Sequence, residues 1–123
     1  MDTDSLHIRI GHSPDPDDAF MFYALTTGVF DTPGREYEHV LLDIQTLNEK
    51  ALRQEYEISA VSIHSFPKII GNYALMNCGA SMGEGYGPML IANQEFTKDE
   101  AKSKTIAIPG LDTSAYLALR LAW

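Results

Sequence analysis

The chain has little cysteine, few basic residues and no long apolar run. Cys78 is its single cysteine in 123 residues, which excludes an internal disulfide and is typical of a reducing compartment. Because Cys78 has apolar neighbours, we expect it to lie in the core rather than to act as a nucleophile. No apolar stretch approaches the length of a membrane span. Residues 1–5 lack the basic and apolar regions of a secretory signal, so we expect a cytoplasmic protein without a membrane partner.

Basic residues are outnumbered, with 9 Lys and Arg against 17 Asp and Glu. Residues 1–60 hold 12 acids and 4 bases, and residues 61–123 hold 5 of each, so the first half carries the whole net charge of -8. The absence of a basic patch argues against a nucleic-acid partner. The sequence also lacks a Cys/His cluster with zinc-site spacing, and we expect no metal site.

Short apolar runs alternate with helical patterns along the chain. The expected strands are residues 6–11, 38–42, 58–61, 73–76, 89–92 and 105–108. The expected helices are residues 17–27 and 44–55, a helical turn from Phe66 and a helix from Thr113. This alternation predicts an α/β fold with a mostly parallel sheet.

The most informative stretch is residues 12–20, which read His-Ser-Pro-Asp-Pro-Asp-Asp-Ala-Phe. Asp15, Asp17 and Asp18 fall on a turn between a strand and a helix, where open α/β sheets place their ligand sites. Helix capping is a full alternative, with Asp15 as N-cap, Pro16 at the first helical position and two acids in the first turn. A calcium loop is disfavoured because the further ligand and the glycine that it needs are missing.

Two later junctions also follow predicted strands. Ser62 and His64 come directly after residues 58–61, although a lone histidine is more often structural than catalytic. Residues 109–115 form a strand-loop-helix junction whose free N–H groups would suit a carboxylate. Thr113 and Ser114 could add hydroxyl donors there, and simple N-capping by Asp112 or Thr113 is the alternative.

The loop at residues 79–88 is rich in glycine. Gly83, Gly85 and Gly87 superficially match a dinucleotide fingerprint, but the third glycine is misplaced and no helix follows. A hinge or a close backbone approach is the better interpretation.

Several of these segments resemble the 1,4-dihydroxy-6-naphthoate synthases of the futalosine route to menaquinone. The matching segments are residues 13–25, Leu47-Asn48, Ser62, the Gly-x-Gly-x-Gly-Pro of residues 83–88 and the Pro-Gly-x-x-Thr-Ser-Ala-Tyr of residues 109–116. The first and last are the specific ones.

The resemblance implies a periplasmic-binding-protein-like (type II) fold with substrate held between two lobes. Residues 1–93 would form the first lobe, residues 94–103 a crossover linker, and residues 104–123 the first strand and helix of the second lobe. Family members are much longer, so we expect this chain to be an N-terminal portion or a truncated product.

The resemblance also implies a lyase that converts cyclic dehypoxanthinyl futalosine to 1,4-dihydroxy-6-naphthoate. The implied substrate-binding residues are Ala60, Val61, Ser62, Thr113 and Ser114, with Ser13, Asp15, Asp17, Asp18 and His64 as weaker candidates. The family's general base is a histidine beyond Trp123, so we expect this chain to be inactive alone and its catalytic residues to be unknown.

Three alternatives remain open. Chorismate dehydratase, from the same pathway, shares the fold but has a less similar opening motif. A non-catalytic protein of this fold that binds a small molecule is the second alternative. The third concerns assembly: residues 104–123 could pair with another copy and form a homodimer.

Overall fold

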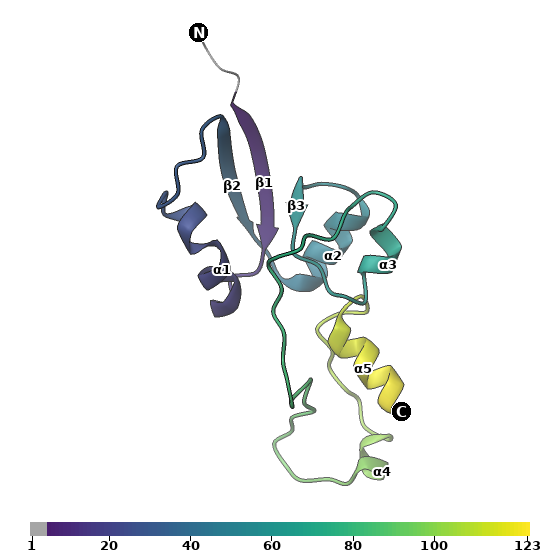
Figure 1. Ribbon diagram of the computed structural model, residues 1–123. Coiled ribbons are helices and arrows are strands. Elements are labelled where there is room, and N and C mark those ends of the chain that lie inside the picture. The colour runs from purple at the N-terminus through teal and green to yellow at the C-terminus, as the bar shows by residue number, and fades with distance from the viewer. Residues whose placement is uncertain (1–4) are drawn as a thin grey trace.

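A three-stranded parallel sheet forms the centre of the fold (Figure 1). The computed structural model describes residues 5–123, so most of the acidic start that argues against a secretory signal, residues 1–4, lies outside the described residues. The strands are β1 (Leu6–His12), β2 (Arg35–Leu41) and β3 (Ile58–Ser59), in the order β2-β1-β3. The helices are α1 (Pro16–Thr26), α2 (Ile44–Leu52), α3 (Phe66–Ile69), α4 (Lys98–Ala101) and α5 (Ser114–Ala122). The prediction of an α/β fold with a parallel sheet is confirmed.

Local signals in the sequence set the helix ends. Pro16 is the first residue of α1, as predicted, and Gly28, with a φ of +70°, follows the C-terminus of that helix. The carboxylate of Asp43 caps α2 by accepting the backbone N–H of Thr46 at 3.0 Å. Helix α4 was not predicted, although a capping box between Thr97 and Glu100 gave a signal for it.

Three predicted strands were wrong within the described part of the chain, because residues 73–76, 89–92 and 105–108 form no strand. A strand needs a neighbouring strand as its hydrogen-bond partner, and a short apolar run does not reveal whether one is available. Figure 1 shows the chain leaving the sheet after α3, passing through α4 and returning to α5. Cys78 is exposed on this excursion, so the prediction of a core position for it was also wrong.

The excursion, residues 73–97, leaves large apolar side chains in solvent. Met82, Met89 and Ile91 are 87%, 84% and 86% exposed. The buried apolar residues are few and lie mostly on β1, α2 and α3: Ile10, Leu47, Ala51, Ile69 and Ala101. None of the helices in residues 5–123 has the length and apolarity that a membrane crossing requires.

Different helices cover the two faces of the sheet. Successive side chains of β1 point to opposite faces. On one face, His12 stacks on Phe22 of α1 with ring centroids 4.4 Å apart. On the other face, a Cβ added to Gly11 would lie 2.8 Å from Cδ2 of Leu47 and 2.7 Å from Cδ2 of Tyr56. The missing side chain of Gly11 therefore allows α2 and Tyr56 to approach β1 closely.

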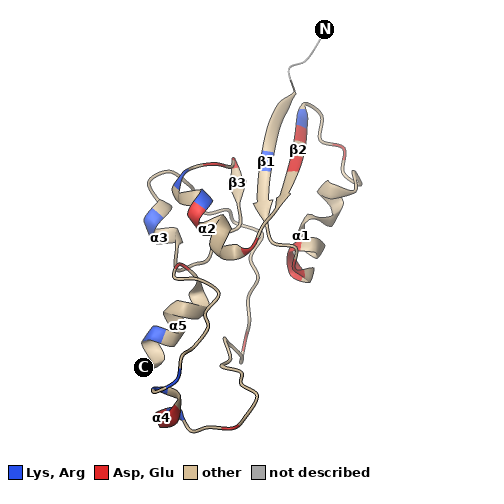
Figure 2. Cartoon of the chain, turned by 180° about the vertical axis from the view of Figure 1, so that it is seen from behind, with Lys and Arg blue, Asp and Glu red and all other residues tan. Residues whose placement is uncertain are grey.

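Figure 2 shows acidic residues alone on α1, basic residues alone on β1, α3 and α5, and residues of both signs on β2, α2 and α4. On β1, Arg9 binds Glu57 through both carboxylate oxygens, at 2.7 and 3.0 Å. These hydrogen bonds lower the pKa of Glu57 to about 2.

We expect Gly11→Ala to lower the free energy of unfolding by about 1–3 kcal/mol, because the methyl group overpacks the contact with Leu47 and Tyr56. Urea unfolding followed by circular dichroism measures this. The matched control is Gly87→Ala, since a Cβ at that residue meets no atom within 4 Å. Equal unfolding midpoints for the two variants would contradict the close-approach role of Gly11.

Candidate functional site

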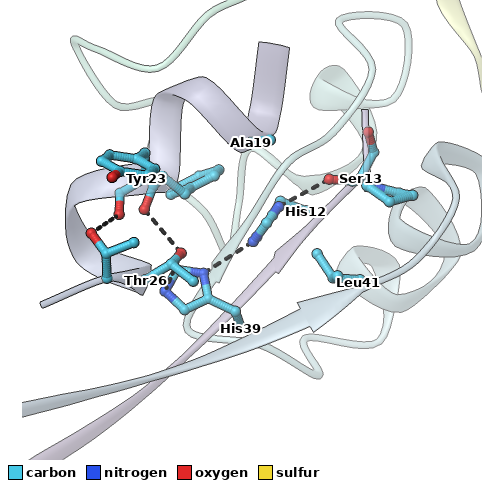
Figure 3. A pocket seen from close by; sticks show the side chains of 10 residues that line it. His12, Ser13, Ala19, Tyr23, Thr26, His39 and Leu41 are labelled. Atoms are coloured by element: carbon cyan, nitrogen blue, oxygen red, sulfur yellow. Dashed lines mark hydrogen bonds between the residues drawn. The ribbon is translucent and has the colours of Figure 1, made fainter. Parts of the chain in front are cut away.

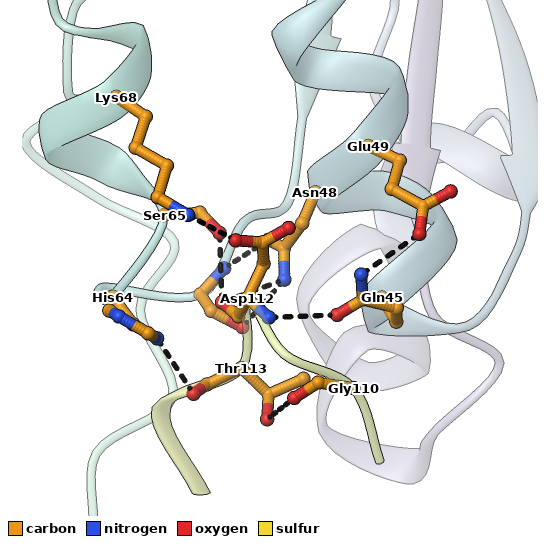
Figure 4. Close-up of polar contacts among 10 residues, drawn as sticks. Gln45, Asn48, Glu49, His64, Ser65, Lys68, Gly110, Asp112 and Thr113 are labelled. Atoms are coloured by element: carbon orange, nitrogen blue, oxygen red, sulfur yellow. Dashed lines mark hydrogen bonds and ion pairs between the residues drawn. The ribbon is translucent and has the colours of Figure 1, made fainter. Parts of the chain in front are cut away.

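The polar residues that follow β3 meet a loop from far along the chain. We call residues 109–113, which precede α5, the Asp112 loop. Figure 4 shows this loop held between α2, α3 and the segment between β3 and α3. The segment after β3 begins with Ala60, whose backbone N–H donates to the carbonyl of Gly11 at 2.8 Å. The Asp112 loop therefore lies beside the carboxyl end of the sheet, where α/β proteins bind ligands.

Asn48 of α2 is the centre of this arrangement and is fully buried. Its side-chain oxygen accepts the backbone N–H of Ser62 at 2.8 Å. Its amide donates to the Ser62 hydroxyl oxygen at 3.1 Å and to the carbonyl of Asp112 at 3.2 Å. One buried side chain thus joins three segments that are distant in sequence.

Asp112 is held from two further sides. Its carbonyl accepts the hydroxyl of Ser65 at 2.8 Å, and its backbone N–H donates to Oε1 of Gln45 at 3.1 Å. Its carboxylate forms an ion pair with Lys68 of α3. That ion pair lowers the pKa of the Asp112 carboxyl below its usual value. The backbone N–H, the carbonyl and the carboxylate of Asp112 are therefore each held by another side chain.

The start of α5 shows which residue is its N-cap. The hydroxyl of Thr113 accepts the backbone N–H of Tyr116 at 3.2 Å and donates to the carbonyl of Gly110 at 2.8 Å. Of the two predicted caps, Asp112 and Thr113, the structure therefore has Thr113 as the N-cap of α5. Because the Thr113 side chain is buried and doubly bonded, its hydroxyl is already occupied.

His64 and Ser114 lie against the same helix start. The backbone N–H of His64 donates to the Ser114 hydroxyl oxygen at 3.4 Å. Nδ1 of His64 lies 3.1 Å from the carbonyl of Thr113 and carries the proton, since a carbonyl can only accept. The structure thus brings together Ser62, His64, Thr113 and Ser114 around the Asp112 loop. Figure 4 shows His64 and Thr113 in this arrangement.

The other predicted residues gather at a different place, the start of α1. Asp15 occupies the N-cap position, but its side chain forms no capping hydrogen bond, so that part of the capping prediction was wrong. The hydroxyl of Ser13 accepts the backbone N–H of Asp15 at 3.1 Å, and Asp18 accepts the N–H of Ser13 at 2.7 Å. A hydrogen bond from Ser81 is the main cause of a lowered pKa at Asp17.

The predicted residues therefore form two groups, one on each side of the sheet. The first surrounds the Asp112 loop, and the second folds the turn between β1 and α1. In residues 5–123 no three His, Cys, Asp or Glu side chains are grouped so that they could hold a metal ion.

No role was predicted for Asn48, although the pair Leu47-Asn48 is one of the segments that match the family. The available signal was a polar side chain inside the apolar stripe of α2, beside Leu47 and Ala51. A fully buried amide is kept in such a stripe only when it finds hydrogen-bond partners.

We expect Asn48→Ala to lower the free energy of unfolding by about 1–3 kcal/mol, since Ser62 N–H and the Asp112 carbonyl each lose a buried partner. Native-state hydrogen exchange of the Ser62 amide should rise in parallel. Asn72→Ala, at an exposed residue beyond α3, is the control. Unchanged protection of Ser62 in the Asn48 variant would refute the role assigned to the buried amide.

The lowered pKa of Asp112 predicts an acid-sensitive contact. The carboxylate stabilises the fold above its usual pKa of 3.8, and this stabilisation is lost as the pH falls through the lower pKa of the folded state. We therefore expect a smaller loss of stability between about pH 6 and pH 3 in Lys68→Met than in the parent chain. Lys102→Met, which breaks the exposed ion pair with Asp99, should leave the loss unchanged. Identical pH profiles for the Lys68 variant and the parent chain would argue against the contact.

The chain matches known proteins along most of its length. The sequence model of a family described as menaquinone biosynthesis matches residues 8–123. Proteins named 1,4-dihydroxy-6-naphthoate synthase from Thermus thermophilus and Streptomyces coelicolor are each 34% identical to it over 93% of this chain. A crystal structure of a protein from Archaeoglobus fulgidus matches 94% of the chain with 49% identity and a TM-score of 0.85.

These relatives are considerably longer. The matches cover 41% and 39% of the two named synthases and 42% of the archaeal chain, so the present chain spans about two fifths of their length. The resemblance seen in the sequence motifs is confirmed by the family match and by both named relatives. This chain belongs to the menaquinone biosynthesis family.

Proposed function

We propose that this chain supplies substrate-binding residues of a lyase that converts cyclic dehypoxanthinyl futalosine to 1,4-dihydroxy-6-naphthoate. The observation that carries the proposal is the fixed start of α5, where a clamped loop presents hydroxyl and N–H donors beside the sheet. Membership of the menaquinone biosynthesis family and the name of two relatives direct this site toward the naphthoate synthase reaction.

The donors at this site suit a carboxylate. The hydroxyl oxygens of Ser114 and Ser62 each accept a hydrogen bond from within the protein, which leaves their own hydrogens to donate. The first N–H groups of α5 have no partner inside the helix, and the helix dipole adds positive potential there. We assign carboxylate binding to Ser114 and these N–H groups, with Thr113 as the cap that orients them.

Ser62 and the backbone of Ala60 and Val61 would contact the substrate from the β3 side. The turn residues Ser13, Asp15, Asp17 and Asp18 would shape a wall of the binding site. This assignment is supported by the hydrogen bonds through which Asp18 and Ser13 hold the turn in one conformation at the carboxyl end of β1.

We extend the proposal to a two-lobed protein with the substrate between the lobes. Residues 1–93 would belong to the first lobe, residues 94–103 to a crossover, and residues 104–123 to the start of the second lobe. The supporting features are the excursion of the chain after α3 and the greater length of the relatives. The apolar side chains that this excursion exposes would then be covered in the complete protein.

The reaction needs a base that removes a proton beside a carbonyl group. His64 lies at the site, where its Nδ1 donates a proton to the carbonyl of Thr113 and its Nε2 remains an acceptor. The family resemblance assigns the base to a histidine of the second lobe. We therefore propose that the 123-residue chain binds without turnover and that the complete cytoplasmic enzyme needs neither metal nor cofactor.

Replacing Ser114 by Ala should weaken binding of 1,4-dihydroxy-6-naphthoate by about tenfold, since one hydrogen bond to a charged group is lost. Isothermal titration calorimetry measures the affinity. Ser103→Ala is the control, because that hydroxyl donates to the carbonyl of Glu100 at the end of α4. Equal affinities of the Ser114 and Ser103 variants would remove Ser114 from the binding site.

The reaction itself is tested by incubating cyclic dehypoxanthinyl futalosine with this chain, alone and together with the rest of a relative's sequence. Mass spectrometry should detect 1,4-dihydroxy-6-naphthoate in the combined sample alone. Consumption of chorismate, when it replaces cyclic dehypoxanthinyl futalosine in the same incubation, would point to chorismate dehydratase. Binding without product in either sample would point to a non-catalytic binding protein.

A further inference from the structure

A cavity lies between α1 and the sheet, and Ser13 is the one residue of the proposed substrate site that lines it. Its volume is about 340 Å³, and its walls include Phe22, Tyr23 and Leu41 together with the two imidazoles of His12 and His39 (Figure 3). None of the described Asp, Glu, Lys or Arg residues lines it. It lies on the α1 face of β1, whereas α2, which helps to hold the Asp112 loop, covers the opposite face.

The hydrogen bonds fix the protons of the neutral histidine pair. Nδ1 of His12 lies 3.0 Å from the carbonyl of Ser13 and must donate to it. Nε2 of His12 is then an acceptor, and Nδ1 of His39, 3.0 Å away, donates to it. Each ring is thereby restricted to the tautomer that carries its proton on Nδ1.

Nε2 of His39 is therefore the acceptor that remains in the pair. It lies 3.5 Å from the hydroxyl oxygen of Thr26, but that hydroxyl donates to the carbonyl of Phe22 at 3.0 Å. Among the described residues, no other donor contacts this nitrogen. Burial, and then the neighbouring His12, lowers the pKa of His39, which disfavours protonation of this nitrogen.

The walls indicate which ligand would use this acceptor. Phe22 stacks on His12 and stands edge-on to His39, with centroids 5.9 Å apart, so the cavity presents aromatic surfaces at fixed angles. An anion would find no cationic side chain there, and a cation would find no carboxylate. A flat, uncharged ring with one hydroxyl group satisfies both the apolar walls and the single acceptor.

We propose that this cavity is a binding site for small neutral phenols, with the ring against Phe22 and Leu41 and the hydroxyl donating to Nε2 of His39. The proposal does not depend on the naphthoate synthase reaction. It rests on the imidazole pair and the aromatic walls, and the residues proposed to bind the futalosine substrate do not supply its acceptor.

The test is a titration of the ¹⁵N-labelled 123-residue chain with phenol and, separately, with anisole, which has the same ring but no donor. We expect shifts at residues of α1 and β2 and an affinity about fivefold higher for phenol than for anisole, the effect of one neutral hydrogen bond. Equal affinities for the two probes, or shifts located away from α1 and β2, would overturn the proposal.

A variant separates the acceptor from the cavity walls. His39→Phe keeps an aromatic ring but removes the nitrogen, so phenol should bind no better than anisole. His7→Gln is the control, because His7 is exposed and contacts Glu38 on β2. A phenol preference that survives in His39→Phe would overturn the proposal. If that variant does not fold, the phenol and anisole comparison in the parent chain still decides the question.

Discussion

The amide of Asn48 is the interaction on which the Asp112 loop most depends. It is fully buried and joins α2, the segment after β3 and the loop before α5. A buried amide destabilises the fold when its hydrogen-bond partners are missing. When they are present, it fixes their positions relative to one another. The loop that begins α5 is therefore held at a defined position relative to the sheet, although Asp112 and Asn48 are 64 residues apart in the sequence.

The same local chemistry determines what the helix start can offer. Thr113 uses its hydroxyl within the protein, whereas Ser114 and Ser62 keep a hydrogen that can be donated outward. In the proposed function, such a site would recognise an anion through donors that are oriented before the ligand arrives, which reduces the entropy cost of binding. The cavity with aromatic walls and a single acceptor lies on the α1 face of β1. On the other face, the absence of a side chain at Gly11 lets α2 pack close to β1.

The sequence predicted those features that depend on neighbouring residues. Pro16 lies at the first position of α1, where the pattern placed it, and the alternation of elements predicted the parallel sheet. Residues 89–92 show the limit, because their apolar run has the composition of a strand but no partner strand lies beside it. For Asn48 the sequence shows a polar side chain within an apolar stripe, but it does not identify the partners Ser62 and Asp112, which meet Asn48 only in the folded chain.

The central claim is that the clamped start of α5 binds the carboxylate of a menaquinone precursor. The most direct measurement is a crystal structure of the chain with 1,4-dihydroxy-6-naphthoate. The account predicts a carboxylate oxygen about 3 Å from the Ser114 hydroxyl and from an N–H group in the first turn of α5. A carboxylate located elsewhere, with the Ser114 hydroxyl contacting only water, would contradict it.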